Sequence, residues 1–210
     1  MGRMLVKICG LTNPEEAVYL NRNQVDYAGI VLFYEKSRRN NTVQNAKKIL
    51  SALDRSIQKV AVVVSPSKEE VKQVEEAGFD YIQIHGIVSE ELLGSISIPV
   101  FKAFNVTDIG QFENYRGCTK IVGYIFDAAE PGSGRTFDWN LVKRIPRDGK
   151  LFLLAGGLTP ENVAEAALAA SVDGVDVSTG VEYSGKSGKD PEKIDLFVKR
   201  AREGCEIDES

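Results

Sequence analysis

Short apolar runs recur eight times along this chain of 210 residues, and longer amphipathic stretches separate them. The runs are rich in Val and Ile and almost continuously apolar, which is typical of strands covered on both faces. They begin at intervals of roughly 20–30 residues, as in repeated strand–helix units. The predicted strands are Leu5–Cys9, Tyr27–Phe33, Lys59–Val64, Tyr81–His85, Val100–Phe104, Ile121–Asp127, Leu151–Ala155 and Gly174–Ser178.

Helix start signals lie between these runs. A capping residue followed by proline occurs at Asn13-Pro14, Thr159-Pro160 and Asp190-Pro191, and Ser67 with Glu70 fits a capping box. Parallel strands joined by helices through right-handed crossovers form an α/β sheet. Eight such units predict a single (β/α)8 TIM barrel over residues 1–210, near the small end for that fold.

The alternative fold is an open doubly wound sheet. That fold more often carries a glycine-rich fingerprint after its first strand, and Cys9-Gly10-Leu11-Thr12 does not match one. With 43% hydrophobic residues, the chain can bury a full core. The barrel is therefore the favoured prediction.

Composition excludes several classes of function. The net charge of −4 and the short basic cluster at 36–39 argue against nucleic acid as a partner. No apolar run approaches the roughly 20 residues of a membrane helix, and Met1–Val6 is too short for a secretory leader. Three cysteines at unrelated spacings, Cys9, Cys118 and Cys205, suit a reducing cytoplasm. With His85 as the only histidine, we predict no metal site.

Two predicted loops near the end of the chain suit a phosphate group. Gly156-Gly157 follows the seventh strand and permits close backbone approach, and Ser178-Thr179-Gly180 follows the eighth. Barrels commonly hold phosphate between these two loops. Taken alone, Gly156-Gly157 could be only a tight turn and Ser178 only a helix cap. Because both segments follow the strands whose loops commonly bind phosphate, together they predict a phosphate site.

Titratable side chains stand at the exits of several strands. A free cysteine is most often inert, yet Cys9 ends the first strand, and Lys7 on the same strand face would lower its pKa. Asp127 ends the sixth strand, where it either caps a loop or acts as a general acid.

Three further polar residues are candidates for the same rim. Asp176 can point inward from an apolar strand and then needs a partner or ligand. Arg39 can stack on a flat ring or pair with a carboxylate. For His85, the sequence favours a structural role and a role in lining the site equally.

An ordered set of motifs in this chain resembles the phosphoribosylanthranilate isomerase family of tryptophan biosynthesis, over nearly its whole length. The matching segments are Lys7-Ile8-Cys9-Gly10-Leu11-Thr12, Phe33-Tyr34 with Ser37 and Arg39, Gln83-Ile84-His85-Gly86, Lys102-Ala103-Phe104, Gly134 with Thr136-Phe137-Asp138-Trp139, Leu154-Ala155-Gly156-Gly157-Leu158-Thr159-Pro160-Glu161-Asn162-Val163, and Gly174-Val175-Asp176-Val177-Ser178 with Gly180-Val181-Glu182.

The resemblance implies an Amadori rearrangement of a small phosphorylated substrate without a cofactor. It implies Cys9 as the general base, which takes the proton from C2 of the ribose, and Asp127 as the general acid, which opens the furanose ring. It places Arg39 and Asp176 at the anthranilate end and the phosphate at Gly157 and residues 178–180. Monomer and homodimer both fit this family.

The chain departs from the family pattern at three places. Thr179 replaces a common serine and keeps the hydroxyl. Arg38 stands where the family often has proline, and Tyr183–Gly188 replaces a common Pro-Gly turn. Two rivals are another phosphate-barrel sugar isomerase and a noncatalytic ligand-binding barrel. The first tends to use paired aspartates or a metal, and the second would not need both Cys9 and Asp127.

Overall fold

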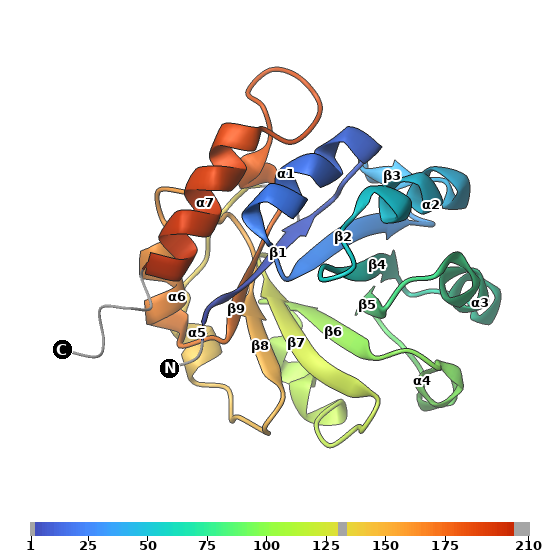
Figure 1. The fold of residues 1–210 in the computed structure, drawn as a ribbon. Helices are drawn as coiled ribbons and strands as arrows, with labels where there is room; N and C mark the ends of the chain where they lie inside the picture. The colour runs from blue at the N-terminus through green and yellow to red at the C-terminus, as the bar shows by residue number, and fades with distance from the viewer. Residues whose placement is uncertain (1–2, 130–133, 204–210) are drawn as a thin grey trace.

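The computed structural model describes residues 3–129 and 134–203 and shows a closed ring of parallel strands surrounded by helices (Figure 1). The ring is formed by eight strands: β1 (Leu5–Cys9), β2 (Tyr27–Leu32), β4 (Gln58–Val64), β5 (Tyr81–His85), β6 (Val100–Asn105), β7 (Ile121–Asp127), β8 (Leu151–Leu154) and β9 (Gly174–Val177). The two ends of the sheet close through pairing of β1 with β2, as predicted for a (β/α)8 barrel.

Helical segments follow the strands in the sequence, and the helices α1 to α7 lie around the outside of the ring (Figure 1). The helical segments are η1 (Pro14–Glu16), α1 (Ala17–Asn23), α2 (Val43–Ala52), α3 (Lys68–Ala77), α4 (Glu90–Ser95), η2 (Ile109–Asn114), α5 (Asn140–Lys143), α6 (Val163–Ala170), η3 (Thr179–Val181) and α7 (Pro191–Glu203). None of the helices in the described ranges is long and apolar enough to cross a membrane.

The predicted strand bounds agree with the structure to within one residue. Phe33, predicted to end the second strand, has a φ of 57° and so leaves the extended conformation. The two-residue strand β3 (Asn40–Asn41), which pairs with β2, was not predicted. It is too short to produce a periodic pattern in the sequence.

Three of the four helix start signals behave as predicted and one does not. Asn13 caps η1, which begins at Pro14. Ser67 and Glu70 form a reciprocal capping box at α3, and α7 begins at Pro191. The predicted helix start at Thr159-Pro160 is wrong, because α6 begins at Val163. The amide of Thr159 donates to Oδ1 of Asn162 at 2.8 Å, so this segment forms a turn stabilised by side chains.

Side chains on the two faces of the strands pack into two separate hydrophobic cores. One lies between strands and helices, and the smaller one contains residues from five of the strands together with Ala155 after β8. In the smaller core the rings of Tyr27, Tyr81 and Phe101 pack with centroids 5.3–5.7 Å apart. Tyr27 and Tyr81 are the first residues of their strands, so this cluster fills the amino-terminal end of the barrel. The opposite end, at the carboxyl ends of the strands, is where barrels of this kind carry their active sites.

Candidate active site

A cavity of about 740 Å³ opens at the carboxyl ends of the strands. Its lining contains ten of the residues singled out from the sequence: Cys9, Arg39, His85, Asp127, Gly156, Gly157, Asp176, Ser178, Thr179 and Gly180. Lys7, the eleventh, is fully buried beneath the cavity. The fold therefore brings strand exits that are up to 171 positions apart in the sequence (9 to 180) to one pocket.

Cys9 and Lys7 share the space above Gly29 on the neighbouring strand β2. A Cβ atom at Gly29 would come 2.8 Å from Sγ of Cys9 and 3.0 Å from Nζ of Lys7. Real Cβ contacts are longer than this, so a glycine is required if both side chains are to keep their positions. The sequence offered no periodic signal for this role, which arises only from the pairing of β1 with β2.

The pKa of Cys9 is raised, which corrects the expectation that Lys7 would lower it. Burial is the largest cause, and the nearby carboxylate of Asp176 acts in the same direction. Lys7 does favour the thiolate, as expected, and so does Lys189. The two cations together do not overcome the loss of solvent around the sulfur.

Asp176 and Lys7 form a buried ion pair under the cavity. Nζ of Lys7 donates to Oδ2 of Asp176 at 2.8 Å, and the side chains are 0% and 6% exposed. Within the described part of the chain, Oδ1 of the same carboxylate has no hydrogen-bond partner, although it is buried. Because Asp176 also lines the cavity, that oxygen is an available acceptor for a ligand N–H or O–H.

Asp127 ends β7 on the other side of the β8 and β9 exits from Cys9. Burial raises the pKa of its carboxyl to about 6; the backbone N–H of Ala128 opposes the shift, and the Asp176 carboxylate adds to it. The Ala128 amide donates to Oδ1 at 2.7 Å, which orients the group. A carboxyl with a pKa of about 6 retains a useful protonated fraction near neutral pH, as a general acid requires.

His85 is neutral across the physiological range. Burial lowers its pKa to about 3, and Lys102 and Lys7 add to this effect. Nε2 of His85 lies 2.8 Å from Nε2 of Gln83. Since the amide nitrogen is the donor, Nε2 of the ring accepts, and this hydrogen-bond pattern assigns the proton to Nδ1. His85 lines the site, and its ring can offer one N–H donor.

The two loops predicted to hold phosphate are pressed against their neighbours. A Cβ atom at Gly157 would meet the backbone of Arg135 at 2.5 Å, and Gly157 has a φ of 63°. A Cβ atom at Gly180 would lie only 1.9 Å from the carbonyl oxygen of Leu158. Glycine at position 157 therefore lets the β8 loop approach the segment after β7, and glycine at position 180 lets the β9 loop approach the β8 loop.

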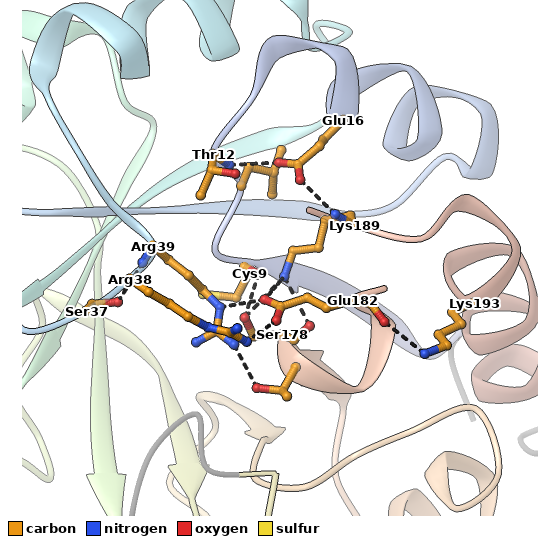
Figure 2. Close-up of polar contacts among 12 residues, drawn as sticks. Cys9, Thr12, Glu16, Ser37, Arg38, Arg39, Ser178, Glu182, Lys189 and Lys193 are labelled. Carbon is orange, nitrogen blue, oxygen red and sulfur yellow. Dashed lines mark hydrogen bonds and ion pairs between the residues drawn. The ribbon is translucent and has the colours of Figure 1, made fainter. Parts of the chain in front are cut away.

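Arg39 crosses from the loop after β2 to the β9 loop (Figure 2). Its Nε donates to Oε1 of Glu182 at 2.6 Å, and its Nη2 donates to Oγ1 of Thr179 at 2.7 Å. Arg38 also pairs with Glu182. The guanidinium of Arg39 thus lies beside a residue of the predicted phosphate loop in this structure.

Sequence reasoning missed Glu182 and Lys189 as parts of the site. Glu182 was noted only within a motif, and Lys189 lies in a loop before α7 with no distinctive spacing. Lys189 is 1% exposed and contacts Ser178 and Glu182. A charged residue that is buried must have partners, but a sequence does not report which lysine is buried.

The acidic and thiol groups of the site do not gather as metal ligands. In residues 3–129 and 134–203, no three His, Cys, Asp or Glu side chains form a group that could hold an ion. Cys9 and Cys118 are free thiols. Cys205 and the loop residues 130–133 lie outside the described residues.

Comparison with protein families gives one match over most of the chain. A family model described as N-(5'phosphoribosyl)anthranilate (PRA) isomerase matches residues 6–200. A protein of that name from Aquifex aeolicus is 36% identical over 203 residues, covering 94% of this chain and 98% of the relative. The one from Geotalea uraniireducens is 39% identical over 205 residues, covering 94% and 98%.

Solved structures give the same result. The phosphoribosyl anthranilate isomerase of Thermotoga maritima superposes with a TM-score of 0.84 at 34% identity, covering 95% of this chain and 99% of that one. A phosphoribosyl anthranilate isomerase in complex with reduced 1-(o-carboxyphenylamino)-1-deoxyribulose 5-phosphate has a TM-score of 0.81 at 33% identity, with coverage of 95% and 99%.

Proposed function

This chain belongs to the N-(5'-phosphoribosyl)anthranilate isomerase family, and we propose that Cys9 and Asp127 carry out the proton transfers of its reaction. The reaction is the Amadori rearrangement of N-(5-phosphoribosyl)anthranilate to 1-(2-carboxyphenylamino)-1-deoxyribulose 5-phosphate, a step of tryptophan biosynthesis. The observation that carries the proposal is the placement of a thiol and a raised-pKa carboxyl at two strand exits of one cavity.

Ring opening is the first step. The carboxylic acid of Asp127 donates its proton to the furanose ring oxygen, the bond from that oxygen to C1 breaks, and the anilino nitrogen supplies electrons to form a C1=N iminium. The pKa of about 6 supports this role, because an ordinary aspartate would hold its proton far less often at neutral pH.

Proton removal from carbon is the second step. The Cys9 thiolate takes the proton on C2, a C1=C2 double bond forms, and the iminium nitrogen recovers its electron pair. The resulting enol becomes the 2-ketone when C1 gains a proton and the hydroxyl loses one. The thiolate is the reactive form, so the cations beside Cys9 assist this step.

Asp176 lies on β9, between the strands that carry the acid and the base. Its unpartnered Oδ1 is suited to accept a hydrogen bond from the substrate, and the anilino N–H is the donor next to the reacting carbons. Lys7 reaches the other oxygen of the same carboxylate, so we assign it an indirect part in binding through Asp176. We also assign Arg39 and the neutral ring of His85, which line the cavity, to the anthranilate end. In this structure the guanidinium of Arg39 is bound to Glu182 and Thr179, so it would have to turn toward the anthranilate.

We assign the phosphate to the loops after β8 and β9, around Gly156, Gly157 and residues 178–180. Inorganic phosphate should therefore inhibit competitively. Gly180→Ala should raise both its inhibition constant and the KM by about 10-fold or more, because a Cβ atom there forces the two loops apart at the Leu158 carbonyl. Steady-state kinetics with added phosphate measure both constants.

Gly94→Ala is the matched control for this experiment. Gly94 lies within α4, and a Cβ atom there would meet no atom within 4 Å. An unchanged inhibition constant in Gly180→Ala, with a normal response in the control, would contradict the assignment of the phosphate site to these loops.

Gly29→Ala should lower kcat by about 10- to 100-fold, since a new methyl group displaces the thiol and the ammonium that lie over this glycine. The phosphate loops are untouched, so KM should change little. Gly94→Ala again provides the control, and thermal unfolding shows whether the variant keeps its fold. A fully active, folded Gly29→Ala protein would contradict the placement of Cys9.

The enzyme acts on a small phosphorylated substrate. We infer that it works in the cytoplasm as a monomer or homodimer, without nucleic acid or membrane as a partner. The free thiols at Cys9 and Cys118 and the net negative charge support this setting. A solved relative consists of monomers generated from the dimeric phosphoribosylanthranilate isomerase of Thermotoga maritima.

A further inference from the structure

Lys189 is a buried lysine whose ammonium contacts three oxygen acceptors. Its Nζ donates to the carbonyl oxygen of Ser178 at 3.0 Å, to Oγ of Ser178 at 3.2 Å and to Oε1 of Glu182 at 3.2 Å. A protonated lysine has three N–H donors and no acceptor, so this set matches the charged form fully. Burial lowers the pKa of Lys189, and the Glu182 carboxylate opposes that shift.

The Ser178 hydroxyl continues the chain of hydrogen bonds to Cys9. Because its oxygen accepts from Lys189, its proton is directed elsewhere, and it donates to the carbonyl oxygen of Cys9 at 2.9 Å. Figure 2 shows Lys189 pointing toward Ser178 and Glu182 beside Cys9. One side chain thus fixes both the start of the predicted phosphate loop and the backbone at the exit of β1.

Lys189 is itself held at its backbone. Its N–H donates to Oε1 of Glu16 at 2.8 Å, while Oε2 of Glu16 accepts from the amides of Thr12 and Asn13 at 2.7 and 3.2 Å. The carboxylate therefore joins the loop after β1 to the segment before α7. This anchoring leaves the Lys189 ammonium little freedom to turn away from Ser178.

The charged groups that influence the Cys9 thiol come from three segments of the chain. Lys7 lies on the same strand, Asp176 on β9, and Lys189 on the segment before α7. Lys7 is paired with Asp176, and Lys189 with Glu182, which also binds Arg38 and Arg39. Removing Lys189 would leave one of the two buried cations that favour the thiolate.

We propose that Lys189 is a positioning residue for the Cys9 thiolate: through its hydrogen bonds to Ser178 it holds the backbone at the exit of β1, and it places a second buried ammonium in the site in addition to that of Lys7. The inference rests on the proposed function of Cys9. It extends the site to a residue that does not line the cavity, and it gives the segment before α7 a part in the reaction.

The test is the pH dependence of Cys9 alkylation by iodoacetamide in the free enzyme, resolved by peptide mass spectrometry so that all three cysteines are followed separately. Only the thiolate reacts. Lys189→Met should slow alkylation of Cys9 about 3- to 10-fold at a fixed pH below the thiol pKa, since one pKa unit changes the thiolate fraction tenfold. Lys189→Arg, which keeps the charge, should retain most of the rate.

Lys193→Met is the matched control. The Lys193 ammonium donates to the carbonyl oxygen of Glu182 and to the Ser184 hydroxyl. The substitution therefore removes a nearby cation whose hydrogen bonds to Glu182 and Ser184 do not involve Ser178 or Cys9. Alkylation of Cys9 should follow the wild-type profile in this variant. If Lys189→Met does not fold, Lys189→Gln provides the same comparison.

Turnover distinguishes a positioning role from a purely structural one. Folded Lys189→Met should lose kcat by about 10-fold with a smaller change in KM, in step with the alkylation rate. A higher KM with unchanged kcat and an unchanged alkylation profile would overturn the proposal. Alkylation is measured without substrate, so it still tests Lys189 if Cys9 proves not to be the base.

Discussion

Cys9→Ser should lower kcat by about 10²–10⁴-fold, the usual contribution of a positioned base. A serine hydroxyl fits the space over Gly29, but it ionises far less readily than a thiol and so cannot take the proton from C2. KM should change much less, because the phosphate loops and Asp176 remain in place. Loss of substrate fluorescence at saturating concentration gives kcat, and circular dichroism confirms folding.

Cys118→Ser is the control for this substitution. Cys118 is also a partly buried free thiol, but it precedes β7 at the amino-terminal end of the barrel. We expect wild-type kinetics from it. Near-normal turnover in Cys9→Ser would refute the assignment of the base and would make Asp176 the next residue to substitute.

Asp127→Asn should cost a similar factor, about 10²–10⁴-fold in kcat. The amide oxygen can still accept from the Ala128 N–H, so the shape of the loop is kept, but the group can no longer donate an acidic proton to the ring oxygen. The KM should again change little, and the same fluorescence assay measures both constants.

Asp127→Glu separates chemistry from geometry. It restores an acid but moves it by one methylene, so it should recover part of the lost rate without reaching the wild-type value. Equal activity of the Asn variant and the wild type, with both folded, would exclude Asp127 as the acid.

The barrel itself could be predicted because its signals are local. Each strand is a short Val- and Ile-rich run with a clear end, and caps such as Ser67 with Glu70 mark helix starts. The predictions that failed depend on conformation rather than periodicity. Phe33 adopts a left-handed φ, and Asn162 draws the Thr159 amide into a turn before α6 begins.

The rim of the site was predictable because parallel strands of a barrel deliver their exits to one end. Cys9 and Asp127 could be selected on that ground before any contact was known. Gly29 and Lys189 could not, since their roles depend on contacts between distant segments. The Lys189 amide meets Glu16 across 173 positions of sequence, and no spacing rule reports such a pair.

The direction in which the Cys9 pKa is shifted shows a further limit of sequence reasoning. The spacing of Lys7 and Cys9 correctly predicts that they share a strand face. It does not show that the thiol is buried, nor that Lys7 is paired with Asp176, whose charge opposes ionisation of the thiol. Burial was the larger effect, so the sign predicted from one neighbour was wrong.

The resulting order of pKa values has a kinetic consequence. In the proposed mechanism the active form has a Cys9 thiolate and a protonated Asp127, while the thiol pKa is raised and the carboxyl pKa is about 6. Near neutral pH the abundant form is therefore thiol with carboxylate, which carries the same number of protons as the active form. Both limbs of the pH profile then belong to the coupled pair.

The most direct test is the pH dependence of kcat/KM on freshly made N-(5-phosphoribosyl)anthranilate, followed by loss of fluorescence. The account predicts a rate that rises to about pH 6, stays level, and falls where the thiol ionises. In Asp127→Asn the limb near pH 6 should vanish, and the residual rate should rise up to the thiol pKa. Absence of turnover in the folded wild type, or a limb near pH 6 that persists in Asp127→Asn, would contradict the proposed acid–base pair.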